Sequence, residues 1–190
     1  MLYIAGASDR LGRVADGNTV LDFDSEEKRR KSSVSSAIAA LEWDNTKLNI
    51  IDAPGLFDFE GGAAEAVRAA EAVLIVTSAG SGVDVGTEKA FRAAEKKGAA
   101  KFFAVTKTDS DHRNFYKTFD ALKEVYGNKL CPTIIPYMEG NITKCYVNLM
   151  TGMAFSYDEN GKATKVPVPE DSVIEEMTSA FMEAVATTDD

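Results

Sequence analysis

The stretch NIIDAPGLF, residues Asn49 to Phe57, decides how the rest of the chain is interpreted. Two β-branched residues, Ile50 and Ile51, lead into Asp52, and a Pro-Gly corner follows. A carboxylate at the end of a buried strand is costly unless a partner or a ligand compensates for it. The stretch therefore predicts a strand that ends at a ligand-binding edge of a sheet, where the carboxylate of Asp52 binds a partner or a ligand.

Predicted strands and helices alternate around this stretch. Residues 33–43 and 47–52 flank an Asp-Asn-Thr turn and predict a hairpin. The continuous apolar run AVLIVTS, residues 72–78, predicts a strand buried on both faces. The next predicted elements are a helix over 86–98 capped by Thr87, a strand over 100–109, a helix over 114–127 and a strand over 132–137. This order predicts an α/β domain with a mostly parallel sheet and helices on both faces.

The pattern changes after Tyr137. Residues 145–169 alternate between apolar and polar around an Asp-Glu-Asn-Gly turn, and residues 169–190 predict a helix. We therefore predict an α/β domain over residues 1–138 and a small α+β appendage over residues 139–190.

Composition excludes several classes of protein. The 190 residues carry a net charge of −9. Proteins that bind free DNA without sequence preference do so through an excess of positive charge, so this class is not expected. No apolar run is long enough to cross a membrane, and the first residues do not resemble a signal peptide. The two cysteines, Cys131 and Cys145, lack a metal-binding spacing and fit a reducing compartment. We therefore expect a cytoplasmic protein.

Two predicted strands end in polar motifs, IIDAPG and AVTKTD. Ligands of parallel sheets bind outside the carboxyl ends of the strands. Asp52 could hold Mg²⁺ there, and a glycine lets a backbone N–H approach a γ-phosphate. Lys107 could lie along a purine face, and Asp109 could accept hydrogen bonds from guanine. For each motif alone, the alternative is that Asp52 caps a turn and that Lys107 and Asp109 are loop charges.

Together these motifs resemble the GTPase domain of translation elongation factor G, a P-loop NTPase fold. The segment after Tyr137 resembles the G′ subdomain inserted in that domain. The resemblance implies GTP or GDP with Mg²⁺ as cofactors and the ribosome, both its RNA and its proteins, as partner. The residues on the family's GTP motifs are Asp52, Ala53, Pro54, Gly55, Leu56, Thr106, Lys107, Thr108 and Asp109, and those implied to bind Mg²⁺ are Ser33 and Asp52.

The chain departs from the family at several positions. Counting back from Asp52, Lys31 stands where the family's first switch segment has glycine, and Ser33 stands where it has threonine but keeps the hydroxyl. Leu56 replaces the histidine that orients the attacking water, and leucine has no hydrogen-bonding group. Hydrolysis by the family's usual route is therefore in doubt, so whether the protein is an active GTPase stays open at this stage.

A G-x-x-x-x-G-K-[ST] phosphate loop does not occur in the 190 residues. The family places this loop upstream of a segment like Met1–Gly6, so we expect a fragment that lacks the loop and the first strand. The alternative is a natural degenerate homologue. We expect the fragment to be inactive and to bind no nucleotide. Its two open strand edges should pair with each other or with a second copy, giving a homodimer.

Three functions follow from these observations. The first is a translational GTPase of the elongation factor G type that acts on the ribosome in elongation. The second is a GTP-dependent ribosome-binding switch that hydrolyses GTP poorly, as Leu56 suggests. The third is a nucleotide-free interaction module, as the missing phosphate loop suggests.

Overall fold

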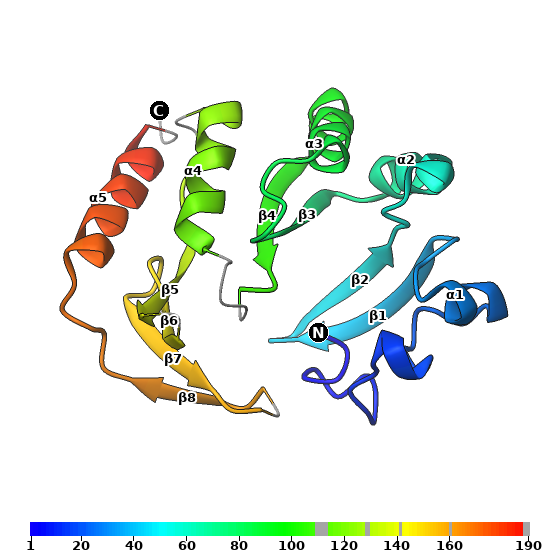
Figure 1. Ribbon diagram of the computed structural model, residues 1–190, viewed down its shortest axis with the longest axis horizontal. Helices are drawn as coiled ribbons and strands as arrows, with labels where there is room; N and C mark the ends of the chain where they lie inside the picture. The colour runs from blue at the N-terminus through cyan, green and yellow to red at the C-terminus, as the bar shows by residue number, and fades with distance from the viewer. Residues whose placement is uncertain (109–113, 128–129, 141, 160, 188–190) are drawn as a thin grey trace. The chain divides into compact units, whose positions relative to one another are not determined.

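The computed structural model describes residues 1–108, 114–127, 130–140, 142–159 and 161–187 (Figure 1). The chain separates into two compact units. The first unit comprises Met1–Ile75 and Asp84–Phe103, and the second comprises Val76–Val83 and Ala104–Asp190. Each unit is described by itself below.

The first unit contains a β-hairpin and several helices that follow or precede it in the chain. These elements are η1 (Val14–Asp16), α1 (Ser25–Arg30), β1 (Ala37–Trp43), β2 (Thr46–Asp52), η2 (Phe57–Phe59), α2 (Glu60–Ala69) and α3 (Val85–Lys97).

The predicted hairpin is confirmed. β1 and β2 pair antiparallel, with Trp43 opposite Thr46 at the turn. The two turn residues, Asp44 and Asn45, have φ angles of 47° and 57°, as a two-residue type I′ turn requires. β1 begins at Ala37 rather than at residue 33, because the preceding residues belong to a loop held by a buried carboxylate.

That buried carboxylate is Glu27 in α1, whose side chain is only 1% exposed. It accepts hydrogen bonds from the backbone N–H groups of Val34 at 3.0 Å and Ser35 at 3.1 Å. It also accepts one from the N–H of Asp24 at 3.1 Å, which completes a capping box at the start of α1. These donors, above all the N–H of Val34, hold the pKa of Glu27 below its ordinary value.

β3 (Ala72–Ser78) and β4 (Ala100–Thr106) form a second sheet, and each contributes residues to both units. The N–H of Ala79 donates to the carbonyl oxygen of Thr106 at 2.9 Å. The carboxyl ends of the two strands therefore lie side by side, so the strands are parallel and α3 forms the crossover between them.

The prediction that β3 is buried on both faces is wrong. Ile75 is buried, but its neighbours Leu74 and Val76 are exposed, Val76 by 61%. On β4, Phe103 stacks on Phe91 of α3 with ring centroids 6.0 Å apart, while Phe102 is exposed. Successive side chains of a strand point to opposite faces, and α3 covers the face of Phe103. One face of this sheet is therefore packed and the other is open.

In the described part of the chain, β2 and β3 are not hydrogen-bonded to each other, since β1–β2 and β3–β4 form separate sheets. Direct pairing of these two strands was one of the two expected ways to satisfy their edges, and the structure does not show it. The other way, pairing with a second copy of the chain, stays a prediction.

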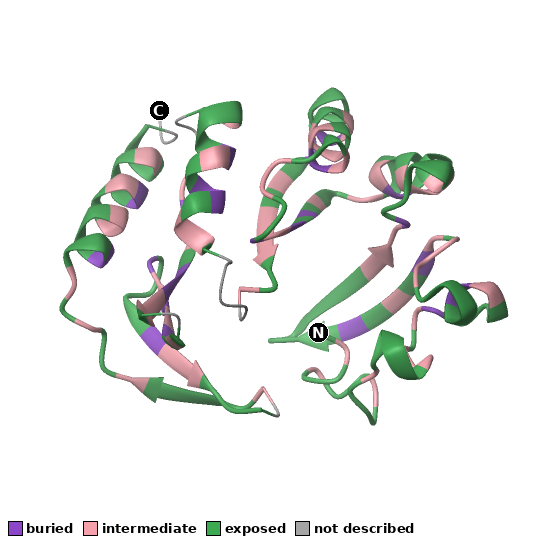
Figure 2. Cartoon of the chain, in the orientation of Figure 1, coloured by how far each residue is buried: buried purple, intermediate pink, exposed green. Residues whose placement is uncertain are grey.

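The second unit also contains a four-stranded antiparallel sheet in the order β5-β6-β7-β8. Its elements are α4 (Phe115–Tyr126), β5 (Ile134–Glu139), β6 (Ile142–Asn148), β7 (Met153–Tyr157), β8 (Ala163–Val166) and α5 (Ser172–Ala186). The core contains Ile135, Cys145, Val147, Leu149, Ala154, Ile174 and Phe181. The buried positions of α4 lie along one side of the helix (Figure 2).

β5 was expected among the strands of the α/β domain, and it pairs antiparallel with β6 of the predicted appendage. The predicted division between residues 138 and 139 stays a prediction. In the described residues, none of the helices has both the length and the apolar character needed to cross a bilayer.

The cap of α3 lies three residues before the predicted one. The carboxylate of Asp84 accepts hydrogen bonds from the N–H of Thr87 at 2.7 Å and from its hydroxyl at 2.9 Å. The prediction that Thr87 is the cap is therefore wrong, because Thr87 is the third helical residue and Asp84 is the N-cap.

The substitution Glu27→Gln should lower the free energy of unfolding at neutral pH by about 1–3 kcal/mol, because charge-assisted hydrogen bonds to three backbone groups are weakened in a buried place. Because the pKa of Glu27 is lowered in the folded state, its stabilisation is complete above the ordinary value of 4.5 and is lost as pH falls below it. Urea denaturation at several pH values measures both effects.

Glu26→Gln is the matched control, since Glu26 lies in the same helix and pairs with the exposed Arg29 and Arg30. Exposed ion pairs contribute little, so this variant should unfold almost like the parent. Equal destabilisation by the two substitutions would contradict the special role of Glu27.

Candidate functional site

Asp52 ends β2, as predicted, and is half-buried. The expectation of a buried strand is wrong, because the first four residues of β2 are exposed and its last three are only half-buried. Burial raises its pKa above the ordinary value, and the nearby carboxylates of Asp22 and Glu27 raise it further. The end of β2 therefore has an excess of negative charge in a partly dehydrated place.

Asp22 connects the two residues implied to bind Mg²⁺. It is buried, and it accepts hydrogen bonds from the hydroxyl of Thr19 at 2.8 Å and from that of Ser33 at 3.0 Å. The same carboxylate raises the pKa of Asp52. The structure thus brings Ser33 and Asp52 to one carboxylate, and here the Ser33 hydroxyl donates to Asp22.

The chemistry of these residues fits Mg²⁺. This ion prefers oxygen ligands, is often bound by only one or two carboxylates, and completes its coordination with water and substrate phosphates. A divalent cation would also relieve the repulsion that raises the pKa of Asp52. No group of three or more His, Cys, Asp or Glu residues placed to hold a metal occurs in the residues that the structure describes.

The Pro-Gly corner after Asp52 rests on the beginning of α2. Pro54 is buried, and a Cβ added to Gly62 would lie 3.5 Å from Pro54 Cδ and 3.1 Å from Ser36 Oγ. The Ser36 hydroxyl donates to the carbonyl oxygen of Gly62 at 3.1 Å. A Cβ added to Gly55 would meet no described atom within 4 Å, so open space lies beside its backbone.

Leu56 and Phe57 follow this corner and are both exposed, by 49% and 54%. Neither side chain is therefore part of the hydrophobic core. Lys89 Nζ lies 4.9 Å from the ring centroid of Phe57 and 2.7 Å from Glu60 Oε2. The segment after Gly55 is thus held to α3 through Phe57 and Glu60.

The second motif, Thr106-Lys107-Thr108-Asp109, begins at the last residue of β4 and belongs to the second unit. The hydroxyl of Thr106 donates to the carbonyl oxygen of Thr77 at 3.1 Å. Lys107 is exposed and has a φ of 56°, in the left-handed region that non-glycine residues rarely adopt. Thr108 is half-buried, and Asp109 lies outside the described residues.

Sequence reasoning missed the roles of Asp22 and Glu27. A signal for Glu27 was present, because Asp24 and Glu27 have the spacing of a capping box. Asp22 had no comparable signal, since its link to Ser33 spans eleven residues and forms only when the loop closes.

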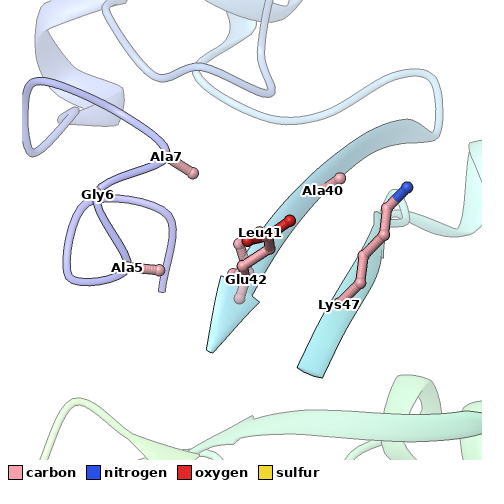
Figure 3. Close-up of a pocket in the computed structure, with 7 residues that line it drawn as sticks. All are labelled: Ala5, Gly6, Ala7, Ala40, Leu41, Glu42 and Lys47. Carbon is pink, nitrogen blue, oxygen red and sulfur yellow. The ribbon is translucent and has the colours of Figure 1, made fainter. Parts of the chain in front are cut away.

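A cavity of about 310 Å³ lies between the first residues of the chain and the hairpin. In Figure 3, Ala5, Gly6 and Ala7 lie on one side of it and side chains of β1 and β2 on the other. Its hairpin residues include the Glu42–Lys47 pair near the turn, whereas Asp52 is paired with Ala37 at the opposite end. The cavity is therefore separate from the strand-end site.

Comparison with known proteins agrees with these motifs. The family model for the elongation factor Tu GTP binding domain matches residues 1–188. The elongation factor G-like protein of Mycobacterium tuberculosis (strain H37Rv) is 31% identical over 97% of this chain and 25% of its own length. Elongation factor G of Mycoplasma genitalium is 29% identical over 100% of this chain and 28% of its own length.

A solved crystal structure of a protein from Thermus thermophilus has the same fold, with a TM-score of 0.92 and 33% sequence identity. The match covers 100% of this chain and 28% of that chain. This chain spans about a quarter of the length of the curated relatives that it matches. The fold class is α/β of the P-loop NTPase type, as the sequence predicts. The chain belongs to the elongation factor Tu GTP-binding domain family and, within it, to the translational GTPases of the elongation factor G type.

Proposed function

We propose that the chain is part of a cytoplasmic translational GTPase that binds GTP with Mg²⁺ and acts on the ribosome during elongation. The observation that carries this proposal is the end of β2, where a raised pKa at Asp52, a nearby Ser33 hydroxyl and open space beside Gly55 occur together. These features suit an anion and a divalent cation bound next to each other.

Each residue has a separate role in this proposal. Asp52 holds Mg²⁺ through water, Ser33 closes the first switch segment over the ion, and the N–H of Gly55 meets the γ-phosphate. Lys107 lies along the purine, and Asp109 accepts hydrogen bonds from the guanine N1–H and 2-amino group. When bound, Mg²⁺ neutralises charge on the β- and γ-phosphates.

A GTP-dependent ribosome-binding switch with poor hydrolysis is the second candidate. The exposed side chain of Leu56 favours it, because leucine neither orients a water molecule nor takes up its proton. The two candidates differ only in the rate of hydrolysis, so one assay separates them.

The 190-residue chain by itself should bind GTP only weakly, with a dissociation constant well above the micromolar range. In this fold the backbone N–H groups and lysine of a phosphate loop provide most of the phosphate binding, and its motif does not occur in these residues. Titration with fluorescent GTP measures the affinity, and light scattering of the same sample gives the mass that tests the expected homodimer. A dissociation constant for GTP in the micromolar range would contradict the expected weak binding. A monomer at high protein concentration would contradict the expected homodimer.

The substitution Asp109→Asn in the full-length protein should change the preferred nucleotide from GTP to XTP. The amide can donate to the 2-oxo group of xanthine, and each lost hydrogen bond to guanine costs about 1–3 kcal/mol. Competition binding with GTP and XTP measures the change. Asp120→Asn, on the exposed side of α4, is the control and should leave the preference unaltered. Parent-like GTP binding by Asp109→Asn would refute the assignment of this motif.

The substitution Leu56→His in the full-length protein should increase ribosome-stimulated GTP hydrolysis, because a positioned acid–base group contributes roughly 10²–10⁴-fold. Multiple-turnover phosphate release with ribosomes measures the rate. Phe57→His places the same side chain one residue away and should give no increase. Rapid hydrolysis by the unmodified protein would instead show that another residue orients the water and would exclude the switch.

A further inference from the structure

The carboxylate of Glu27 joins the two ends of the segment that carries α1 and Ser33. Its Oε2 atom accepts a hydrogen bond from the N–H of Asp24, directly before α1, at 3.1 Å. Its Oε1 atom accepts hydrogen bonds from the N–H groups of Val34 at 3.0 Å and Ser35 at 3.1 Å, which follow α1. Because the two oxygens bond to opposite ends of the helix, one side chain fixes the path of the backbone before and after α1.

The backbone of Glu27 holds the residues that come first after α1. Its carbonyl oxygen accepts hydrogen bonds from the N–H of Lys31, which is the left-handed C-cap of α1, and from the N–H of Ser32 at 3.3 Å. Together with the two N–H groups held by the carboxylate, four of the residues 31–35 are therefore bonded to Glu27. This short stretch, residues 31–35, is called the Ser33 loop below.

Ser33 itself is held by its side chain. Its hydroxyl donates to Asp22 Oδ1 at 3.0 Å, and the other oxygen of this carboxylate accepts a hydrogen bond from the hydroxyl of Thr19 at 2.8 Å. Asp22 is only 9% exposed. Since the neighbours of Ser33 on both sides are attached to Glu27, the place of the Ser33 hydroxyl follows from the position of the Glu27 carboxylate.

The burial of Glu27 makes this attachment strong. The side chain is 1% exposed, so water competes little for its bonds. Opening the Ser33 loop would remove two of the three N–H donors from the carboxylate and leave a buried charge that is poorly compensated. The closed form of the loop therefore depends on groups of the chain itself.

We propose that Glu27 is a positioning residue for Mg²⁺ binding, in that it holds the Ser33 loop closed before the ion binds and thereby presents the Ser33 hydroxyl to the ion. This inference rests on the proposed function, in which Ser33 and Asp52 bind Mg²⁺. A site that is already formed binds its ion more tightly, because the cost of ordering the loop is not subtracted from the free energy of binding.

Hydrogen exchange of the full-length protein, freed of nucleotide and Mg²⁺, tests whether the Ser33 loop is closed beforehand. The amides of Val34 and Ser35 should exchange at least about 10-fold more slowly than those of an open loop, because they donate to a buried carboxylate. The substitution Glu27→Gln should remove most of this protection. Exchange in the parent at the rate of an open loop would overturn the inference, and it would do so without reference to GTP.

Titration of the full-length protein with fluorescent GTP, in Mg²⁺ and in EDTA, tests the effect on the ion. In Glu27→Gln the Mg²⁺ concentration that gives half-maximal GTP binding should rise about 5- to 50-fold, whereas the affinity for GTP in EDTA should stay within roughly 2-fold of the parent value. Glu27→Asp keeps the charge, but its shorter side chain cannot reach both ends of α1. It should show the same rise, and it serves as the test if Glu27→Gln does not fold.

Two controls separate positioning from stability and charge. Leu41→Ala removes a side chain of the hairpin that is 5% exposed, so it lowers stability without touching the Ser33 loop. Glu26→Gln removes a charge from the same helix, where Glu26 pairs with exposed arginines. Neither substitution should change the Mg²⁺ concentration that is required.

The possible results distinguish the inference from the proposed function. An unchanged Mg²⁺ requirement in the Glu27 variants, or an equal rise in Leu41→Ala, overturns the inference and leaves the proposed function intact. A parent protein whose GTP binding does not depend on Mg²⁺ overturns the proposed Mg²⁺ site and the inference with it.

Discussion

The buried carboxylate of Glu27 organises the part of the first unit that leads to the strand-end site. A charged group that is 1% exposed is stable only because backbone N–H groups on both sides of one loop replace its water. The loop is thereby closed, and Ser33 is held within reach of Asp22. The same closure places three carboxylates in one region, where burial together with Asp22 and Glu27 raises the pKa of Asp52. The ionised form of Asp52 is therefore disfavoured, and a cation bound beside it would relieve this.

The second unit uses neutral groups for a similar purpose. There, the hydroxyls of Thr77, Thr106 and Thr118 donate to backbone carbonyl groups at or shortly after the end of β3, and no buried charge takes part in these bonds. Neutral hydrogen bonds carry a smaller desolvation cost than buried ions, and their direction restricts geometry. The exposed Lys107 thus follows a strand end that is hydrogen-bonded to the end of β3.

Local patterns in the sequence were sufficient for much of the fold and for the choice of candidate site residues. The hairpin follows from two β-branched runs around Asp-Asn, because that pair readily adopts the left-handed angles of a type I′ turn. Asp52, Gly55 and Lys107 are candidate site residues because they lie in short motifs that follow predicted strands, and such motifs are contiguous in sequence. The family also follows from these motifs, and the comparisons confirm it.

Only the tertiary structure decided the contacts between distant residues and which faces are covered. The continuous apolar run of β3 gave no sign that Leu74 and Val76 would be exposed, because periodicity describes a strand and not what packs on it. The partner of Ser33 is eleven residues away, and that of Thr118 is 39 residues away. Hydrogen bonds of this kind have no sequence period, since they depend on how loops close and on where strands end. The sequence by itself therefore determined which residues are candidates for ligand binding, and the folded chain decided which contacts hold those of them that the structure describes.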